Sequence, residues 1–270
     1  MLERLLEAFG WPWSGEIEIP VRIFTLPGVF QPRSDAWMLA DAVRRATLDP
    51  RASALDLCTG SGVVAVTTAL RGARLVTAVD THRSSTWTVR LNARVNGVRI
   101  RALRGDLFEP VAGRRFDLIT ANPPYLPAPP DLAPRRGDHA WNAGSDGRAV
   151  IDRIIEQLPH HLEPGGSVLL VQSSVTGTRE TLDRLADVGL QPAIVERRRG
   201  PIGPLMAGRV DYLIREGLLR GPRLEEEVLV IGAQYARARA GLRFMRSGES
   251  GRVSLLHGVR GSEGGARAGA

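Results

Sequence analysis

From residue 52 onward, short apolar runs alternate with segments of helical spacing, and this alternation limits the fold more than any other feature. Strands that alternate with helices favour a parallel sheet with helices on both faces. The sequence therefore predicts an α/β fold, a doubly wound, mostly parallel, seven-stranded sheet. The runs expected to form its strands are residues 54–58, 75–80, 98–103, 116–121, 167–172, 193–197 and 228–231.

The residues on either side of this alternation have other patterns. Leu2–Phe9 has helical spacing, residues 16–24 alternate as a strand does, and Ser34 or Asp35 can cap a helix that ends near Ala46. The last residues are rich in Arg, Gly and Ser with little apolar periodicity, as disordered segments are. We therefore expect an N-terminal extension, a main domain on which it packs, and a disordered tail, over residues 1–48, 49–235 and 236–270.

The charge of the chain lies mainly in the expected tail. The net charge is +7 and every basic residue is arginine. Residues 236–270 contribute +5 of it, from seven arginines and two glutamates, which leaves +2 for residues 1–235. A main part so close to neutral argues against nucleic-acid binding as its chief activity.

Several classes of protein are excluded or disfavoured by composition. No apolar run is long enough to span a membrane, and the N-terminus lacks the pattern of a secretory signal. Cys58 is the single cysteine, so an internal disulfide and a cysteine zinc cluster are excluded, and the histidines lack the spacing of metal ligands. We expect a cytoplasmic protein without a bound metal.

Four groups that can bind a ligand directly follow predicted strands, and ligands of doubly wound sheets bind at that edge. The first is Asp56-Leu-Cys-Thr-Gly-Ser-Gly62, the end of a strand and the glycine turn after it, in which Gly60 and Gly62 let the backbone approach a ligand and the next helix offers its N-terminus to an anion. The second is Asp80, whose carboxylate can accept two ribose hydroxyls. Tight packing of the glycines and helix capping by Asp80 are the structural alternatives.

The third and fourth groups follow the next two strands. Asp106-Leu107 can offer a carboxylate to an adenine amino group and an apolar side chain to its ring, although a solvated turn is the simpler reading. Asn122-Pro-Pro-Tyr125 interrupts an apolar run with two prolines, which fix φ and have no N–H to donate. This pattern predicts a rigid loop that presents the Asn122 amide beside an aromatic wall, unless it is merely a turn that ends the strand.

Taken in order, these groups resemble the motifs of class I methyltransferases that use S-adenosylmethionine (SAM). Over residues 29–175 the chain resembles the HemK/PrmC family, which methylates the side-chain amide of glutamine in translation release factors. The stretch Asn142-Ala-Gly-Ser-Asp-Gly147 matches a glycine-rich stretch of that family, and Val29-Phe-Gln-Pro-Arg-Ser-Asp35 is similar to its shorter, eukaryotic and archaeal branch. Two positions depart: Ala36 stands where that branch has threonine, and Cys58 where the motif has its first glycine.

The resemblance implies a SAM-dependent N-methyltransferase that acts on a planar amide or amino nitrogen, best a protein glutamine. The residues implied to bind SAM are Asp56, Gly60, Gly62, Asp80, Asp106, Leu107 and Asn122. The residues implied to bind the acceptor are Asn122, Pro123, Pro124 and Tyr125, of which Asn122, Pro123 and Tyr125 are implied to be catalytic.

Two alternatives stay open on the sequence. An exocyclic amine of an RNA or DNA base presents the same planar amino group, and a SAM-binding regulatory protein needs no catalysis. The expected partners are a protein substrate such as a release factor and, as in the shorter branch, a small activator subunit; no membrane partner is expected.

Overall fold

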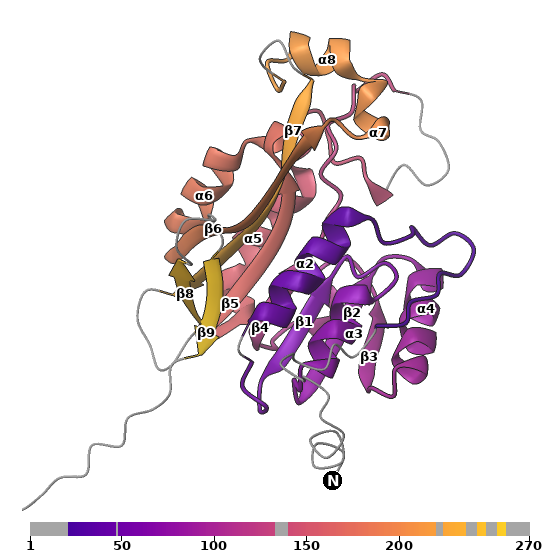
Figure 1. Ribbon diagram of the computed structural model, residues 1–270, viewed down its shortest axis with the longest axis vertical. Helices are drawn as coiled ribbons and strands as arrows, with labels where there is room; N and C mark the ends of the chain where they lie inside the picture. The colour runs from indigo at the N-terminus through magenta and orange to yellow at the C-terminus, as the bar shows by residue number, and fades with distance from the viewer. Residues whose placement is uncertain are drawn as a thin grey trace, which may run out of the picture.

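The structure, a computed structural model, describes residues 21–46, 48–132, 140–219, 224–235, 242–246 and 253–257. The principal strands are β1 (Ser53–Leu57), β2 (Leu75–Asp80), β3 (Ile100–Arg104), β4 (Phe116–Ala121), β5 (Leu162–Ser173), β6 (Leu190–Pro201) and β7 (Glu225–Tyr235). They form one seven-stranded sheet in the order β3-β2-β1-β4-β5-β7-β6 (Figure 1). Strands β1 to β5 pair in parallel, whereas β7 lies antiparallel between β5 and β6. The predicted α/β fold and its strand count are confirmed.

Two apolar cores join helices to the two faces of this sheet. On one face lie α2 (Ser34–Arg45), α3 (Val63–Leu70) and α4 (Arg83–Val95), and on the other α5 (Ala149–His161) and α6 (Thr178–Asp187) (Figure 1). Successive strand residues point to opposite faces, so Ala54 belongs to the first core and its neighbour Leu55 to the second. Short 3-10 turns, η1 (Glu109–Val111) and η3 (Ser174–Thr176), follow β3 and β5.

A third, smaller apolar cluster forms a lobe beyond the ends of β6 and β7. The lobe contains α7 (Pro204–Ala207) and α8 (Val210–Arg215), which Figure 1 shows at the top of the molecule. Its buried residues are Leu126, Val175, Met206, Tyr212, Leu213 and Leu219. Because Leu126 comes from the chain after β4, the lobe packs directly on the loop that carries the Asn-Pro-Pro-Tyr motif.

The predicted strand over residues 16–24 is wrong where the structure describes it, from Val21 onward. This segment is irregular, and its backbone is bonded to two asparagine side chains, one in α4 and one directly after it, in place of a neighbouring strand. Asn96 bonds with the N–H and carbonyl of Arg22, and Asn92 with those of Phe24, over 2.7–2.9 Å. Two asparagine side chains thus supply the partners that a strand ladder would supply. The predicted helix Leu2–Phe9 lies outside the described residues.

Part of the expected tail also differs from the prediction. Residues Leu242–Arg246 (β8) and Val253–His257 (β9) pair as an antiparallel two-stranded ladder. Apolar residues alternate with arginine at 242–244, a short strand-like pattern that the overall composition of the tail conceals. The other residues of 236–270 lie outside the described part. Among the helices that the structure describes, none is long and apolar enough to cross a membrane.

Candidate active site

A cavity of about 470 Å³ opens at the carboxyl ends of β1, β2 and β4. All but one of the site residues proposed from sequence line it, although they come from segments far apart in the chain. The exception is Gly62. The lining residues among them are Asp56, Gly60, Asp80, Asp106, Leu107, Asn122, Pro123, Pro124 and Tyr125.

The two glycines of the turn after β1 serve different purposes. Both have positive φ, +53° at Gly60 and +80° at Gly62. A Cβ on Gly60 would meet no heavy atom within 4 Å, so its backbone borders open space in the cavity. A Cβ on Gly62 would lie 2.9 Å from Cγ2 of Val89, because α3 and α4 approach closely there. Gly62 therefore allows helix packing, and Gly60 leaves room for a ligand.

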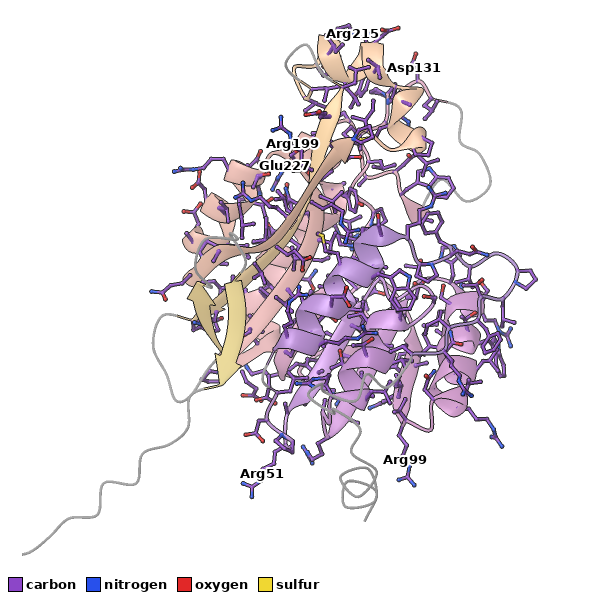
Figure 2. All side chains as sticks on the ribbon, in the orientation of Figure 1. Arg51, Arg99, Asp131, Arg199, Arg215 and Glu227 are labelled. Atoms are coloured by element: carbon purple, nitrogen blue, oxygen red, sulfur yellow. The ribbon has the colours of Figure 1, made fainter. Side chains whose placement is uncertain are left out.

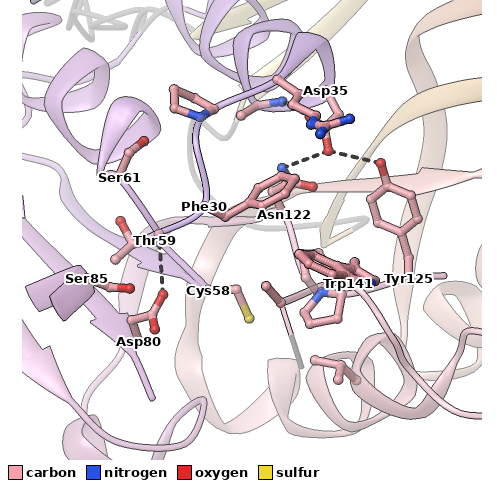
Figure 3. Close-up of a pocket in the computed structure, with 18 of the residues that line it drawn as sticks. Phe30, Asp35, Cys58, Thr59, Ser61, Asp80, Ser85, Asn122, Tyr125 and Trp141 are labelled. Carbon is pink, nitrogen blue, oxygen red and sulfur yellow. Dashed lines mark hydrogen bonds between the residues drawn. The ribbon is translucent and has the colours of Figure 1, made fainter. Parts of the chain in front are cut away.

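Asp80 is held in a fixed orientation at the end of β2. Its Oδ2 accepts the N–H of Gly60 and its Oδ1 the N–H of His82, each at 2.9 Å. A carboxylate oxygen can accept more than one hydrogen bond, so both atoms keep capacity for ligand hydroxyls. The side chain is thus a preorganised acceptor in the wall of the cavity, as Figure 3 shows.

Asp56 lies beneath the cavity. The side chain is buried, and its two oxygens accept the hydroxyls of Thr59 at 2.5 Å and Thr120 at 2.7 Å. Burial raises its pKa to about 6, against the lowering effect of these two hydrogen bonds. These contacts indicate that Asp56 shapes the turn that follows β1.

After β3, the backbone adopts an unusual conformation at Leu107, and the Asp106 carboxylate already has an ion-pair partner. Leu107 is buried with φ +46°, and Cys58, which follows β1 and also lines the cavity, has φ +52°, values that residues other than glycine rarely adopt. Asp106 forms an ion pair with Arg153 of α5 and keeps its second oxygen for a ligand. Burial raises the pKa of the Cys58 thiol, which disfavours a nucleophilic thiolate there.

The Asn122 loop is fixed by a residue that the sequence reasoning treated only as a helix cap. Oδ2 of Asp35 accepts the Asn122 side-chain N–H₂ at 3.2 Å and the Tyr125 hydroxyl at 2.9 Å (Figure 3). Oδ1 of Asn122 is buried and has no hydrogen-bond partner among the described residues. Burial and the neighbouring Asp35 raise the pKa of Tyr125 well above its usual value, so its hydroxyl remains a donor.

Backbone pairing holds this loop against the glycine-rich stretch 142–147. The Leu126 N–H donates to the Trp141 carbonyl at 2.7 Å, and the Ala143 N–H to the Leu126 carbonyl at 3.0 Å. A Cβ on Gly147 would lie only 2.4 Å from the Tyr125 carbonyl oxygen. The lobe adds Arg209, which donates to the Pro127 carbonyl at 2.6 Å and to Oδ1 of Asn142 at 2.7 Å.

Aromatic side chains flank the Asn122 end of the cavity. The rings of Phe30 and Trp141 lie 5.5 Å apart, and the Arg33 guanidinium lies 5.2 Å from the Phe30 ring centre. The sequence analysis matched the segment that ends at Asp35 to the shorter branch of the family, but it did not assign roles to Phe30 or Trp141. Phe30 lies inside a stretch that matched a family motif, and Trp141 lies directly before another such stretch.

Comparison with known proteins agrees with this geometry. The methyltransferase small domain model matches residues 20–131. A Methanocaldococcus jannaschii protein that bears the name of a protein N5-glutamine methyltransferase is 34% identical over 67% of this chain and 90% of its own length. The release factor glutamine methyltransferase of Geobacter sulfurreducens is 32% identical over 68% of this chain, which spans 66% of that longer protein.

The fold also matches a solved structure. The Mtq2-Trm112 complex of E. cuniculi, described as responsible for methylating the eRF1 translation termination factor, superposes with a TM-score of 0.55 at 24% identity. The match covers 77% of this chain and 99% of that one. It establishes the class I methyltransferase architecture of the sheet and its helices.

Proposed function

The chain belongs to the HemK/PrmC-type family of protein glutamine methyltransferases, SAM-dependent enzymes, and on this premise we propose that it methylates the side-chain nitrogen of a protein glutamine. The observation that carries the proposal is the buried, unpartnered Oδ1 of Asn122 at the end of the cavity. A buried acceptor without a partner is costly, so a donor group of the substrate is its natural complement.

The opposite end of the cavity fits SAM, which supplies an electrophilic methyl group on its sulfonium. Gly60 borders open space, and Asp80 offers two oriented acceptors for ribose hydroxyls. The first turn of α3 has no side-chain cap, and its Val63 lines the cavity, so its N–H groups can receive a carboxylate. Asp106 and Leu107 would hold the adenine, which leaves the sulfonium end nearest Asn122.

The residues proposed to bind the acceptor can make an amide nitrogen more reactive. An amide nitrogen is a poor nucleophile because its lone pair is delocalised into the carbonyl. Asn122 Oδ1 would accept one N–H of the substrate, and the Pro123 carbonyl the other, which together favour a pyramidal nitrogen. Tyr125 would pack against the planar group. Positioning of this kind contributes up to ~7–11 kcal/mol in favourable systems.

The walls near Asn122 support a polypeptide loop as the acceptor. Gly28, Phe30, residues 32–36 and Trp141 line one part of the cavity, and Leu205 and Met206 of α7 line another. Between walls from separate segments, the backbone of a substrate polypeptide can continue on either side of the one side chain that enters the cavity. Release factors are the named substrates of relatives, so we propose a glutamine in a release factor's Gly-Gly-Gln loop.

Mass spectrometry of such a loop peptide after incubation with SAM tests the proposal. One methyl group on the glutamine is expected from wild type, with turnover reduced at least about 100-fold by Asn122→Ala and SAM affinity within a few-fold. Asn96→Ala removes an asparagine that bonds with the backbone of Arg22 and Asn92 and does not line the cavity, and this control should keep full activity. An unmodified peptide beside methylated adenine in an RNA sample would contradict the proposal.

A small activator subunit is a further proposal, supported by the surface of α4. Trp87, Leu91 and Val95 lie one helical turn apart and are exposed, by 51%, 37% and 37% of their surfaces. The neighbouring β3 ends the described sheet, so one of its edges is open to pairing. Turnover by the isolated chain in the same experiment would exclude an obligatory activator.

One observation favours the nucleic-acid alternative. Residues 81–105 contain six exposed arginines and no acid, and none of the six forms an ion pair with a carboxylate in the described part of the chain. Figure 2 shows one of them, Arg99, extending away from the sheet beside β3. Such a cluster suits phosphate groups, so the RNA arm of the experiment is a necessary comparison.

A further inference from the structure

Asp35 is the group on which the orientation of the Asn122 amide depends. An amide side chain can rotate by half a turn and exchange its oxygen and nitrogen with little change of shape. A carboxylate accepts hydrogen bonds and donates none, so it fixes the nitrogen of Asn122 toward itself. The 3.2 Å contact between Asp35 Oδ2 and Asn122 Nδ2 therefore turns Oδ1 of Asn122 to the other side, where it is unpartnered.

The carboxylate is itself held on both oxygens. Oδ1 accepts the backbone N–H of Ala36 at 2.8 Å, in the first turn of α2, where negative charge is favourable. Oδ2 also accepts the Tyr125 hydroxyl at 2.9 Å. The helix behind it is anchored by Met38 and Leu39, which are fully buried in the first core. Asp35 is thus a rigid, acceptor-only reference point on a different element from the loop that it orients.

We propose that Asp35 is a positioning residue of this reaction: it selects the orientation of Asn122 in which the side-chain oxygen, and not the nitrogen, meets the acceptor. The inference rests on the proposed function of Asn122. It adds that correct turnover requires an acceptor-only group at position 35, whereas Tyr125 needs only to occupy its place beside the loop. In the reversed orientation the N–H₂ group of Asn122 would face the N–H₂ group of the substrate amide. The substrate nitrogen would then lose its hydrogen-bond partner.

Two substitutions separate orientation from simple loss of a side chain. Asp35→Asn keeps size and shape but can present either an oxygen or an N–H₂ to Asn122, so both amide orientations become available. Asp35→Ala removes the partner altogether. We expect kcat to fall by about tenfold in Asp35→Asn and by about 30-fold or more in Asp35→Ala, with the KM of the peptide and the Kd of SAM within about threefold.

Two further variants serve as comparisons. Tyr125→Phe removes the second hydrogen bond to Oδ2 but leaves the contact with Asn122, and kcat should fall by less than about fivefold. Asp49→Asn removes a carboxylate that accepts the Arg51 N–H in a distant turn, and it should behave as wild type.

The results distinguish this inference from the proposed function. If wild type methylates another acceptor but not the peptide, the proposed substrate is wrong, and the variants are then assayed on the acceptor that wild type does methylate. Wild-type kcat in Asp35→Asn and Asp35→Ala would overturn the role of Asp35. So would a loss confined to SAM affinity, or a Tyr125→Phe loss as large as that of Asp35→Ala. Asp35→Asn keeps the inference testable if Asp35→Ala fails to fold, which thermal unfolding would show.

Discussion

The two ends of the cavity are built in different ways. At the SAM end, Gly60, Asp80 and Asp106 lie at the carboxyl ends of three neighbouring parallel strands, and a contact between adjacent turns fixes the first two, because Asp80 accepts the Gly60 N–H. At the acceptor end, the Asn122 loop is held by α2, by the stretch 140–147 and by the lobe between β6 and β7. The first end depends on the ends of neighbouring strands, and the second on contacts between segments that lie farther apart in the chain.

This difference suggests how one fold serves several acceptors. The SAM end can remain constant as long as the strand ends and their turns are kept. The acceptor end depends on Phe30, Trp141 and Leu205, which come from three separate segments and can be exchanged without disturbing the sheet. We therefore expect substitutions at one end to change one binding step and to leave the other nearly intact.

Gly147→Ala is expected to show the largest difference between the two ends, because it should impair peptide methylation without changing SAM binding. The new Cβ would lie 2.4 Å from the Tyr125 carbonyl oxygen and 2.7 Å from Cγ2 of Thr176, at φ +78°. The loop must then move, and a displacement of about 1 Å can cost about 100-fold in rate. We expect kcat/KM for the peptide to fall by at least that factor, with SAM affinity unchanged by calorimetry.

Gly189→Ala is the matched control for backbone strain. Gly189 has φ +84°, close to that of Gly147, but a Cβ there would meet no heavy atom within 4 Å. Both variants lose a glycine from the left-handed region, so they should carry similar backbone strain, to which Gly147→Ala adds the clash with the loop. Equal activities of the two variants would mean that the contact of Gly147 with the loop is unimportant for transfer.

Asp80→Ala is expected to have a smaller effect, and to act on SAM binding in place of peptide methylation. Loss of an acceptor for ribose hydroxyls, a hydrogen bond to a charged group, should weaken SAM binding by about 10–100-fold. The peptide KM should stay within a few-fold when it is measured at saturating SAM. Unchanged SAM affinity in calorimetry would remove Asp80 from the proposed ribose role.

The SAM end was the more predictable of the two for a physical reason. Asp80 and Gly60 could be placed from sequence because a strand end fixes its own residues to within a turn, and the period of the strands is visible in the sequence. Asp35 was predicted only as a helix cap, since its contact with Tyr125 spans 90 residues. Glu226, which also lines the cavity, was not predicted for the same reason. Its carboxylate accepts the Ser173 hydroxyl, 53 residues away, and the Gly203 N–H, 23 residues away.

The fold followed the same rule. The apolar runs that alternate with helical segments predicted the parallel strands correctly, because burial on both faces makes such strands continuously apolar. Residues 21–24 kept the alternation of a strand, but the side chains of Asn92 and Asn96 took the hydrogen bonds that would have joined it to the sheet. Which groups satisfy a backbone is decided by neighbours that sequence spacing does not show.

Asp56 gives the smallest expected effect on activity and tests whether the two ends are coupled. It accepts Thr59 in the SAM turn and Thr120 on the strand that leads to Asn122. Burial raises its pKa from 3.8 to about 6, so the folded protein holds this proton more tightly than the unfolded chain. Stability should therefore fall as the pH rises from about 4 to 6, by about 3 kcal/mol from this group, and stay level above that range.

Asp56→Asn should flatten that slope while preserving the link between the ends. The asparagine oxygen can accept one threonine hydroxyl, and its N–H₂ can donate to the other, which rotates to accept. Chemical denaturation at pH 4, 5, 6 and 7 would show the slope in wild type and its reduction in the variant. Because neither threonine needs to move, SAM affinity and peptide turnover should remain within a few-fold of wild type. A large loss of both at unchanged stability would show that the negative charge of Asp56 itself, and not only the shape it holds, acts at the two ends together.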